Sequence, residues 1–198
     1  MNIINVNYKW ANPLQKRQGT KYLILHHAAA SKASPEDIHQ WHLEKGWSGI
    51  GYHWVIRKDG NIYQGRPIDV LGAHCEGWNS FSLGICFEGN YEMEQPTPEQ
   101  IQSGIDLIRY VRRTYKNITI LRHKDANPGT TTCPGANFRN IIIYEGSKDM
   151  EQKHWAEDIF KELTEKYGLT IHDKRFDDNI TRGEVFALLK QILDKTIK

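Results

Sequence analysis

The chain has 198 residues, of which 39% are hydrophobic, and its formal net charge is +2 at pH 7. This length suits one domain with a small appendage and is sufficient to bury a hydrophobic core. The nearly neutral charge excludes the strong basic field expected of a surface that binds nucleic acid. No stretch is long and apolar enough to insert into a membrane.

The N-terminal segment and the cysteines indicate where the protein is made. Residues 1–19 are polar and lack the apolar run of a secretory signal. Cys75, Cys86 and Cys133 are odd in number and have no disulfide-framework spacing, so Cys75 and Cys86 are expected to stay thiols. We therefore expect synthesis and folding in a reducing cytoplasm.

The first half of the chain predicts a strand, a helix and a hairpin. Residues 21–27, "KYLILHH", form an apolar run that ends in two histidines and is typical of a buried strand. A helix is expected between an N-cap at Ser34 and a stop at Gly46. Helical spacing places four residues on one face of it: Ile38, Trp41, His42 and Lys45. Asp59 and Gly60 then form a strong hairpin-turn signal between two strands.

The second half predicts two more strands and two helices. Residues 81–89, "FSLGICFEG", are typical of another buried strand. Thr97 and Gln100 form a capping box at the start of an amphipathic helix. Residues 118–121 form a short strand, a loop follows it directly, and residues 137–146 favour a short helix. This order of elements predicts an α/β domain in which helices pack on a central sheet.

The composition changes near residue 147, where the strand signals end. Residues 147–198 predict a small helical module, in which Thr181 and Glu184 form a further capping box. We therefore place a domain boundary between residues 1–146 and residues 147–198.

Three metal-binding side chains lie at the ends of predicted strands. His26 ends the first strand, His123 follows the strand at 118–121, and Cys133 lies in the loop after it. If these strands are neighbours, two imidazoles and a thiolate converge, which suits Zn²⁺ with a fourth position left for water. On spacing alone, however, a buried histidine near a free cysteine is the commoner situation.

Four blocks in the chain carry a family resemblance: "LILHHAA", "QWHLEKGWSGIGYHWVIRKDGNIYQGR", "GAHCEGWNSFSLGICFEG" and "RHKDANPGTTTCPG". Together, over roughly residues 20–145, they resemble the zinc-dependent N-acetylmuramoyl-L-alanine amidases, which include phage endolysins and peptidoglycan recognition proteins. The resemblance implies a central mixed β-sheet flanked by helices. It also implies a Zn²⁺ cofactor and hydrolysis of the amide bond between N-acetylmuramic acid and L-alanine in peptidoglycan.

The resemblance also implies roles for individual residues. His26, His123 and Cys133 match the three metal ligands. Tyr52 matches a tyrosine whose hydroxyl faces the metal, and Thr131 matches a position that holds Lys or Thr, so both are expected to be catalytic. Because Thr131 is neutral, it can donate a hydrogen bond to an oxyanion but supplies no positive charge.

Further residues match positions around the site. His74, Trp78 and Asn79 are expected to contact substrate, and His27 is expected to pack behind the ligands. One departure concerns Cys86, which stands where some bacterial members carry a glutamate as general base. Glu88 is predicted to share a strand face with Cys86, and it either reaches the metal or, as we favour, lies in solvent.

The C-terminal residues "HWAEDIFKELTEKYGLTIHDKRFDDNITRGEVFALLKQIL" resemble a single S-layer homology repeat. This resemblance implies binding of a secondary cell-wall polysaccharide, with Arg182 contacting the glycan through charge-assisted hydrogen bonds. The alternative is a helical module that forms a homodimer or packs on the catalytic domain.

Two other functions compete with a zinc amidase that lyses the cell wall as an endolysin or autolysin. The first is a non-catalytic module that binds peptidoglycan, although relatives of that kind typically lack the cysteine ligand that Cys133 matches. The second is a hydrolase with Cys133 as nucleophile, which its Pro-Gly loop does not favour. Without a signal, a phage-encoded enzyme would need a holin pore to reach the cell wall.

Overall fold

The computed structural model describes residues 2–148, 165 and 190–191, and residues 1–148 form one compact unit. Arg182 and nearly all of the predicted C-terminal module lie outside the described residues. Within the described part, no helix combines the length and apolar character needed to cross a membrane.

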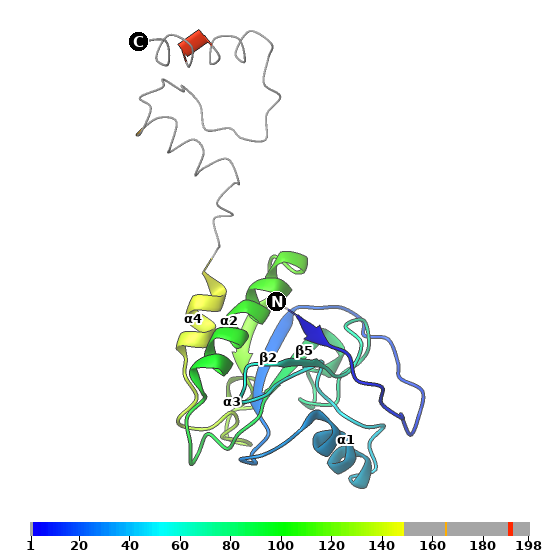
Figure 1. Cartoon of the computed structure of the whole chain (residues 1–198). Coiled ribbons are helices and arrows are strands. Elements are labelled where there is room, and N and C mark those ends of the chain that lie inside the picture. The colour runs from blue at the N-terminus through cyan, green and yellow to red at the C-terminus, as the bar shows by residue number, and fades with distance from the viewer. Residues whose placement is uncertain (1, 149–164, 166–189, 192–198) are drawn as a thin grey trace. The chain divides into compact units, whose positions relative to one another are not determined.

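A β-sheet forms the centre of this unit (Figure 1). It has six strands in the order β1-β4-β3-β5-β2-β6. The strands are β1 (Ile3–Ile4), β2 (Tyr22–His27), β3 (Trp54–Ile56), β4 (Ile62–Gln64), β5 (Ser82–Phe87) and β6 (Thr119–Arg122). β3 and β4 are antiparallel and form the hairpin predicted at Asp59 and Gly60, whereas the other neighbouring strands are parallel. The expected mixed sheet is therefore confirmed.

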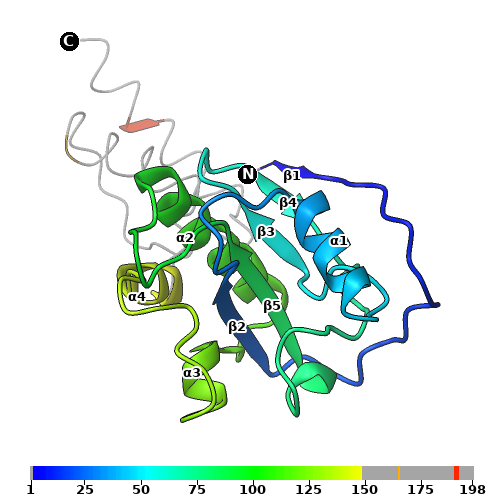
Figure 2. The ribbon, with the colours of Figure 1, turned by 90° about the horizontal axis from the view of Figure 1, so that it is seen from below.

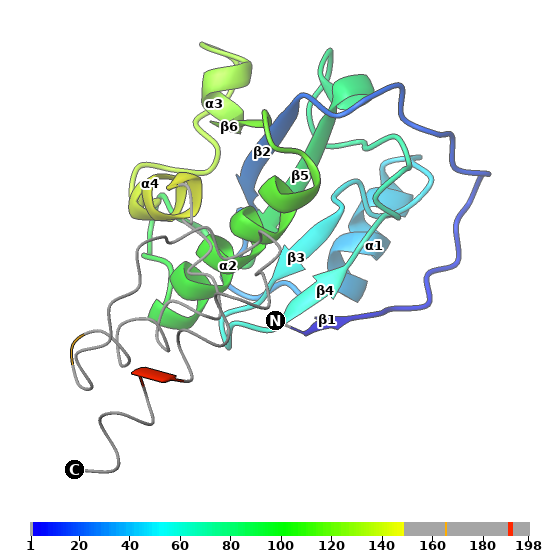
Figure 3. The same cartoon turned by 90° about the horizontal axis from the view of Figure 1, so that it is seen from above.

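Helices cover both faces of the sheet. They are α1 (Pro35–Glu44), α2 (Pro98–Thr114), α3 (His123–Ala126) and α4 (Ile141–Ser147), with a 3₁₀ turn η1 at Asn79–Phe81. Ser34 caps α1 and Thr97 caps α2 in the expected manner, because each side chain accepts a hydrogen bond from a backbone N–H of the first turn. α2 and α4 lie on one side of the sheet and α1 lies on the other (Figures 2 and 3).

The alternation of side chains along β2 sets the position of its histidines. Leu23 and Leu25 belong to the core that α2 and α4 cover, whereas Ile24 faces a separate apolar cluster. His26 follows Leu25, so its side chain points away from α2 and toward the face on which α1 lies. Candidate ligands at the end of β2 therefore lie outside the main hydrophobic core.

Three local features differ from the sequence-based expectation. β1 was not predicted, because two residues are too short for a periodic pattern and the partner strand β4 defines them. α3 is a one-turn helix in the expected loop, where the Asp125 carboxylate accepts hydrogen bonds from Arg122. On α1, Trp41 is 36% exposed, and His39 takes the buried place because its ring contacts the backbone of Lys9 and Ile50.

The expectation that Glu88 lies in solvent is wrong. Glu88 is 2% exposed, and its carboxylate accepts hydrogen bonds from the Arg57 guanidinium and from the N–H groups of Ala33 and Lys58. Burial raises the pKa of Glu88, but the Arg57 and backbone hydrogen bonds outweigh it and leave the pKa below its ordinary value. Glu88 therefore joins three segments structurally and is occupied by these partners.

We expect Glu88→Gln to lower the free energy of unfolding by about 2 kcal/mol at pH 7, because it leaves the buried partners of the carboxylate poorly satisfied. The folded-state pKa is depressed, so this stabilisation is present above the unfolded-state pKa of about 4.3 and is lost as the pH falls through the folded-state pKa. Urea unfolding of the unsubstituted protein and of Glu88→Gln measures this difference in the free energy of unfolding at pH 7 and at pH 3. Glu94→Gln is the control, because its ion pair with Lys58 is more exposed and is worth less than about 1 kcal/mol. Equal effects of the two substitutions would contradict this account.

Candidate metal centre

Strand register brings the two candidate histidine ligands together. β2 and β6 are parallel neighbours, as the convergence of the ligands requires, and Leu25 lies opposite Arg122. A histidine follows each member of this pair, namely His26 on β2 and His123 at the start of α3. Their ring centroids are 4.5 Å apart, so parallel pairing alone places two imidazoles at one edge of the sheet.

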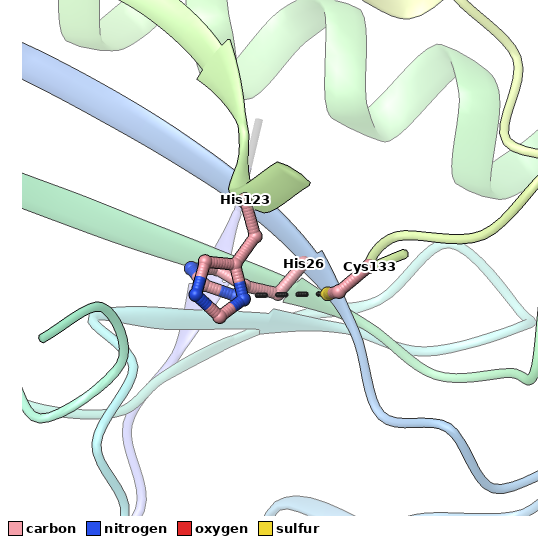
Figure 4. A group of neighbouring side chains, drawn as sticks. All are labelled: His26, His123 and Cys133. Carbon is pink, nitrogen blue, oxygen red and sulfur yellow. Dashed lines mark hydrogen bonds between the residues drawn. The ribbon is translucent and has the colours of Figure 1, made fainter. Parts of the chain in front are cut away.

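The loop after α3 returns Cys133 to the same edge. The Cys133 carbonyl accepts a hydrogen bond from the Lys124 N–H, and its own N–H donates to Thr131 Oγ1. The His27 N–H points at Cys133 Sγ at 3.5 Å. These contacts fix the thiol, and its Sγ lies 3.8 Å from Nδ1 of His26 (Figure 4).

The geometry of these three side chains suits a zinc ion. One potential ligand atom from each of His26, His123 and Cys133 lies within 4.8 Å of the others. Zinc bonds of about 2.0–2.1 Å to nitrogen and about 2.3 Å to sulfur in a tetrahedron separate the donors by about 3.5 Å. Two imidazoles and a thiol form a donor set that zinc prefers and leave one coordination position free. The residues present therefore fit the metal that the sequence implies.

The charge states of these side chains also suit a cation. Burial lowers the pKa of His26 well below its ordinary value, with the neighbouring His74 and His123 adding to the effect, and burial lowers the pKa of His123 too. Both imidazoles are thus neutral at pH 7 and can act as ligands. Burial raises the pKa of the Cys133 thiol to about 12. The thiol therefore stays protonated at neutral pH unless a cation stabilises the thiolate.

The two residues expected to act on substrate lie close to these ligands. The ring of Tyr52 has its centroid 5.1 Å from that of His26. Burial raises the pKa of Tyr52 well above its ordinary value, and the nearby thiols of Cys86 and Cys133 add to this. Tyr52 therefore keeps its phenolic proton at neutral pH. Thr131 Oγ1 accepts a hydrogen bond from the Cys133 N–H at 3.1 Å, and Thr131 also lines a surface pocket of about 390 Å³ that includes neither Tyr52 nor the three candidate ligands.

Cys86, which stands where some bacterial members carry a glutamate, cannot take the place of a carboxylate base. Cys86 is 0% exposed. Burial raises the pKa of its thiol well above the ordinary value, and the neighbouring Cys133 contributes. Because Cys86 stays protonated and Glu88 is held by Arg57, neither residue supplies a base at neutral pH.

The three residues expected to contact substrate also make contacts within the protein. Both ring nitrogens of His74 face protein atoms, on His26 and Ser82. Asn79 Oδ1 accepts hydrogen bonds from the N–H groups of His74 and Cys75. Trp78 packs edge-on against the ring of Tyr22. Their proposed contacts with substrate remain predictions.

Sequence patterns gave no role to Ser82, and His27 was expected only to pack behind the ligands. Ser82 Oγ lies 3.4 Å from His74 Nε2. His27 Nδ1 accepts a hydrogen bond from the Tyr91 N–H, which ties the chain after β5 to the end of β2. Gly84 was one available sequence signal that another group approaches β5 closely, since a glycine inside an apolar strand often marks such an approach.

Comparison with known proteins places this geometry in a family. A family model described as N-acetylmuramoyl-L-alanine amidase matches residues 15–136, the segment that contains all three candidate ligands. The chain belongs to this amidase family. The family and the relatives below identify it as an amidase enzyme.

The amidase is similar to phage and insect proteins. Over 136 residues it is 37% identical to an endolysin of Enterobacteria phage K11, covering 64% of this chain and 88% of that protein. Over 131 residues it is 36% identical to peptidoglycan-recognition protein SC2 of Drosophila melanogaster, covering 61% and 71%. Among solved structures, the endolysin LysCS from Clostridium intestinale URNW matches with a TM-score of 0.64 and 37% identity. The match covers 85% of this chain and 97% of LysCS, which confirms the predicted fold.

Proposed function

We propose that the amidase is zinc-dependent and cleaves the bond between N-acetylmuramic acid and L-alanine in peptidoglycan. The observation that carries the proposal is the convergence of His26, His123 and Cys133 within 4.8 Å. When bound there, zinc would activate water and polarise the scissile carbonyl at neutral pH.

Tyr52 suits the task of stabilising the charge that develops on the carbonyl oxygen. Its raised pKa keeps the hydroxyl protonated, so it can donate a hydrogen bond to an oxyanion. A donor that is already in place costs no reorganisation during the reaction, which is why such groups contribute strongly to catalysis. The adjacency of Tyr52 to His26 puts this donor beside the ligands.

Thr131 suits a weaker version of the same task. Its Oγ1 accepts a hydrogen bond from the Cys133 N–H, and a hydroxyl that accepts one bond still has a proton to donate. A nucleophilic role for Cys133 is disfavoured, because burial raises the pKa of its thiol to about 12 and a thiol is a poor nucleophile.

The relatives support action on the bacterial cell wall. The proteins from Enterobacteria phage K11 and Clostridium intestinale URNW are both named endolysins, so we infer that the amidase lyses walls. A binding module without catalysis is the competing function, because other relatives are named peptidoglycan-recognition proteins. The presence of Cys133 together with Tyr52 favours the enzyme. The proposed polysaccharide-binding or dimerising module at residues 147–198, with Arg182, remains a prediction.

The test is to identify the bond that is cut. Full-length protein would be incubated with purified Gram-positive walls, and released material would be analysed for new L-alanine N-termini and for reducing sugar ends. We expect new alanine N-termini without new reducing ends. Binding to the walls without any new amine would instead support the recognition module, and new reducing ends would indicate a glycosidase.

A further inference from the structure

His74 links a candidate metal ligand to the protein interior. Its Nδ1 lies 3.0 Å from Nε2 of His26, and its Nε2 lies 3.4 Å from Oγ of Ser82. His74 is 8% exposed and Ser82 is fully buried. His26, His74 and Ser82 therefore form a connected row of polar side chains. The row begins at Nε2 of His26, whereas Nδ1 of the same ring faces Cys133.

The tautomers of His26 and His74 set the direction of these hydrogen bonds, and metal binding requires one of them. A neutral imidazole carries one N–H and one lone pair. Nδ1 of His26 faces Cys133 Sγ, so it needs its lone pair to bind a metal, and the proton must then lie on Nε2. That proton has an acceptor within reach, namely Nδ1 of His74. His74 must in turn carry its own proton on Nε2, where Ser82 Oγ can accept it.

We propose that His74 is a positioning residue that holds His26 in the Nε2–H tautomer and fixes its ring for the metal, with Ser82 anchoring His74. The role in metal binding rests on the proposed zinc site, whereas the tautomer is a property of the metal-free protein. Groups that orient a ligating histidine in this way typically change metal affinity by about 10–100-fold when removed.

The packing around His74 restricts its ring to one place. A Cβ atom on Gly84 would lie 2.6 Å from His74 Cγ, and one on Gly72 would lie 2.5 Å from Cδ2. Both distances are shorter than non-bonded carbon atoms can approach, so each glycine leaves room that the ring fills. Asn79 holds the backbone N–H of His74. A clamped ring with two polar partners can orient His26 at little entropic cost.

Two substitutions separate the hydrogen bond from the volume of the side chain. His74→Leu fills the space but accepts no hydrogen bond, whereas the amide oxygen of His74→Asn can accept one near the position of Nδ1. His39→Leu is the matched control, because His39 is also 8% exposed and contacts other segments than the candidate ligands. Zinc affinity would be measured for each full-length variant by competition with a chromophoric chelator.

We expect His74→Leu to weaken zinc binding by about 10–100-fold, and His74→Asn and His39→Leu to stay within about threefold of the unsubstituted protein. The tautomer of His26 would be read from two-bond ¹H–¹⁵N correlations of the metal-free protein, in which Nε2–H is expected. In His74→Leu we expect a mixture of tautomers, and in His74→Asn the Nε2–H form again.

A proton on Nδ1 of His26 in the metal-free, unsubstituted protein would overturn the inference without need of any variant. Unchanged zinc affinity and unchanged tautomer in His74→Leu would also overturn it, as would an equal loss of affinity in His39→Leu. If the unsubstituted protein bound no zinc, the proposed function would fail, while the tautomer measurement would still decide the role of His74.

Discussion

Replacing Cys133 with serine is expected to weaken zinc binding by about 10²–10³-fold. Structural zinc sites gain about 10–16 kcal/mol from four ligands, so one ligand contributes about 2.5–4 kcal/mol, which corresponds roughly to that factor. Serine keeps the size of the side chain but its hydroxyl is a poor zinc ligand. At limiting zinc, amide cleavage should fall at least as far. Competition with a chelator measures the zinc affinity, and release of amines from cell walls measures amide cleavage.

Cys75→Ser is the matched control for this substitution. Cys75 is likewise a free thiol, although it is buried whereas Cys133 is half-buried, and its Sγ donates a hydrogen bond to Asn127 Oδ1 at 3.2 Å, which a serine hydroxyl can replace. We expect this variant to bind zinc and to cleave substrate as the unsubstituted amidase does. A Cys133→Ser protein with full activity and full zinc content would remove Cys133 from the ligand set.

Tyr52→Phe is expected to lower kcat by about 10²–10³-fold with KM and zinc affinity nearly unchanged. The ring and its packing beside His26 are retained, and the hydroxyl is lost. This is the cost seen when one donor to an oxyanion is removed. Steady-state kinetics on a soluble muropeptide would separate kcat from KM.

Tyr22→Phe provides the comparison, because Tyr22 lies on β2 and packs against Trp78. We expect its kinetics to be unchanged. If Tyr52→Phe lost zinc as well as activity, the hydroxyl would be supporting the metal site rather than the reaction. If its kcat were normal, Tyr52 would not be the oxyanion donor.

Much of the fold could be predicted because local signals agreed with tertiary packing. The capping box at Thr97 and Gln100 and the turn at Gly60 each define an element within a few residues. β1 could not be predicted, since two residues become a strand only by pairing with β4. On α1, Ile38 and His42 of the predicted face are buried, but the burial of His39 was missed, because its contacts come from Lys9 and Ile50 in loops outside the helix.

The family resemblance implied the candidate ligands, and topology explains why they converge. Histidines at the ends of two strands converge when the strands are parallel neighbours, as β2 and β6 are. The partner of His26 was not predictable, because His74 lies 48 residues away in the chain and a histidine in a loop gives no sign of its contacts. The burial of Glu88 was missed for a similar reason, since Arg57 reaches it from another strand end.

The most direct test of the proposed zinc dependence is reconstitution of the metal-free protein. Zinc would be removed with a strong chelator and returned in steps, while new L-alanine N-termini are measured at each step. We predict that the metal-free protein is inactive and that activity rises linearly to a plateau at about one zinc per chain, as a three-ligand site with one open position requires. Full activity without zinc, or a protein that binds no zinc at this site, would contradict the account.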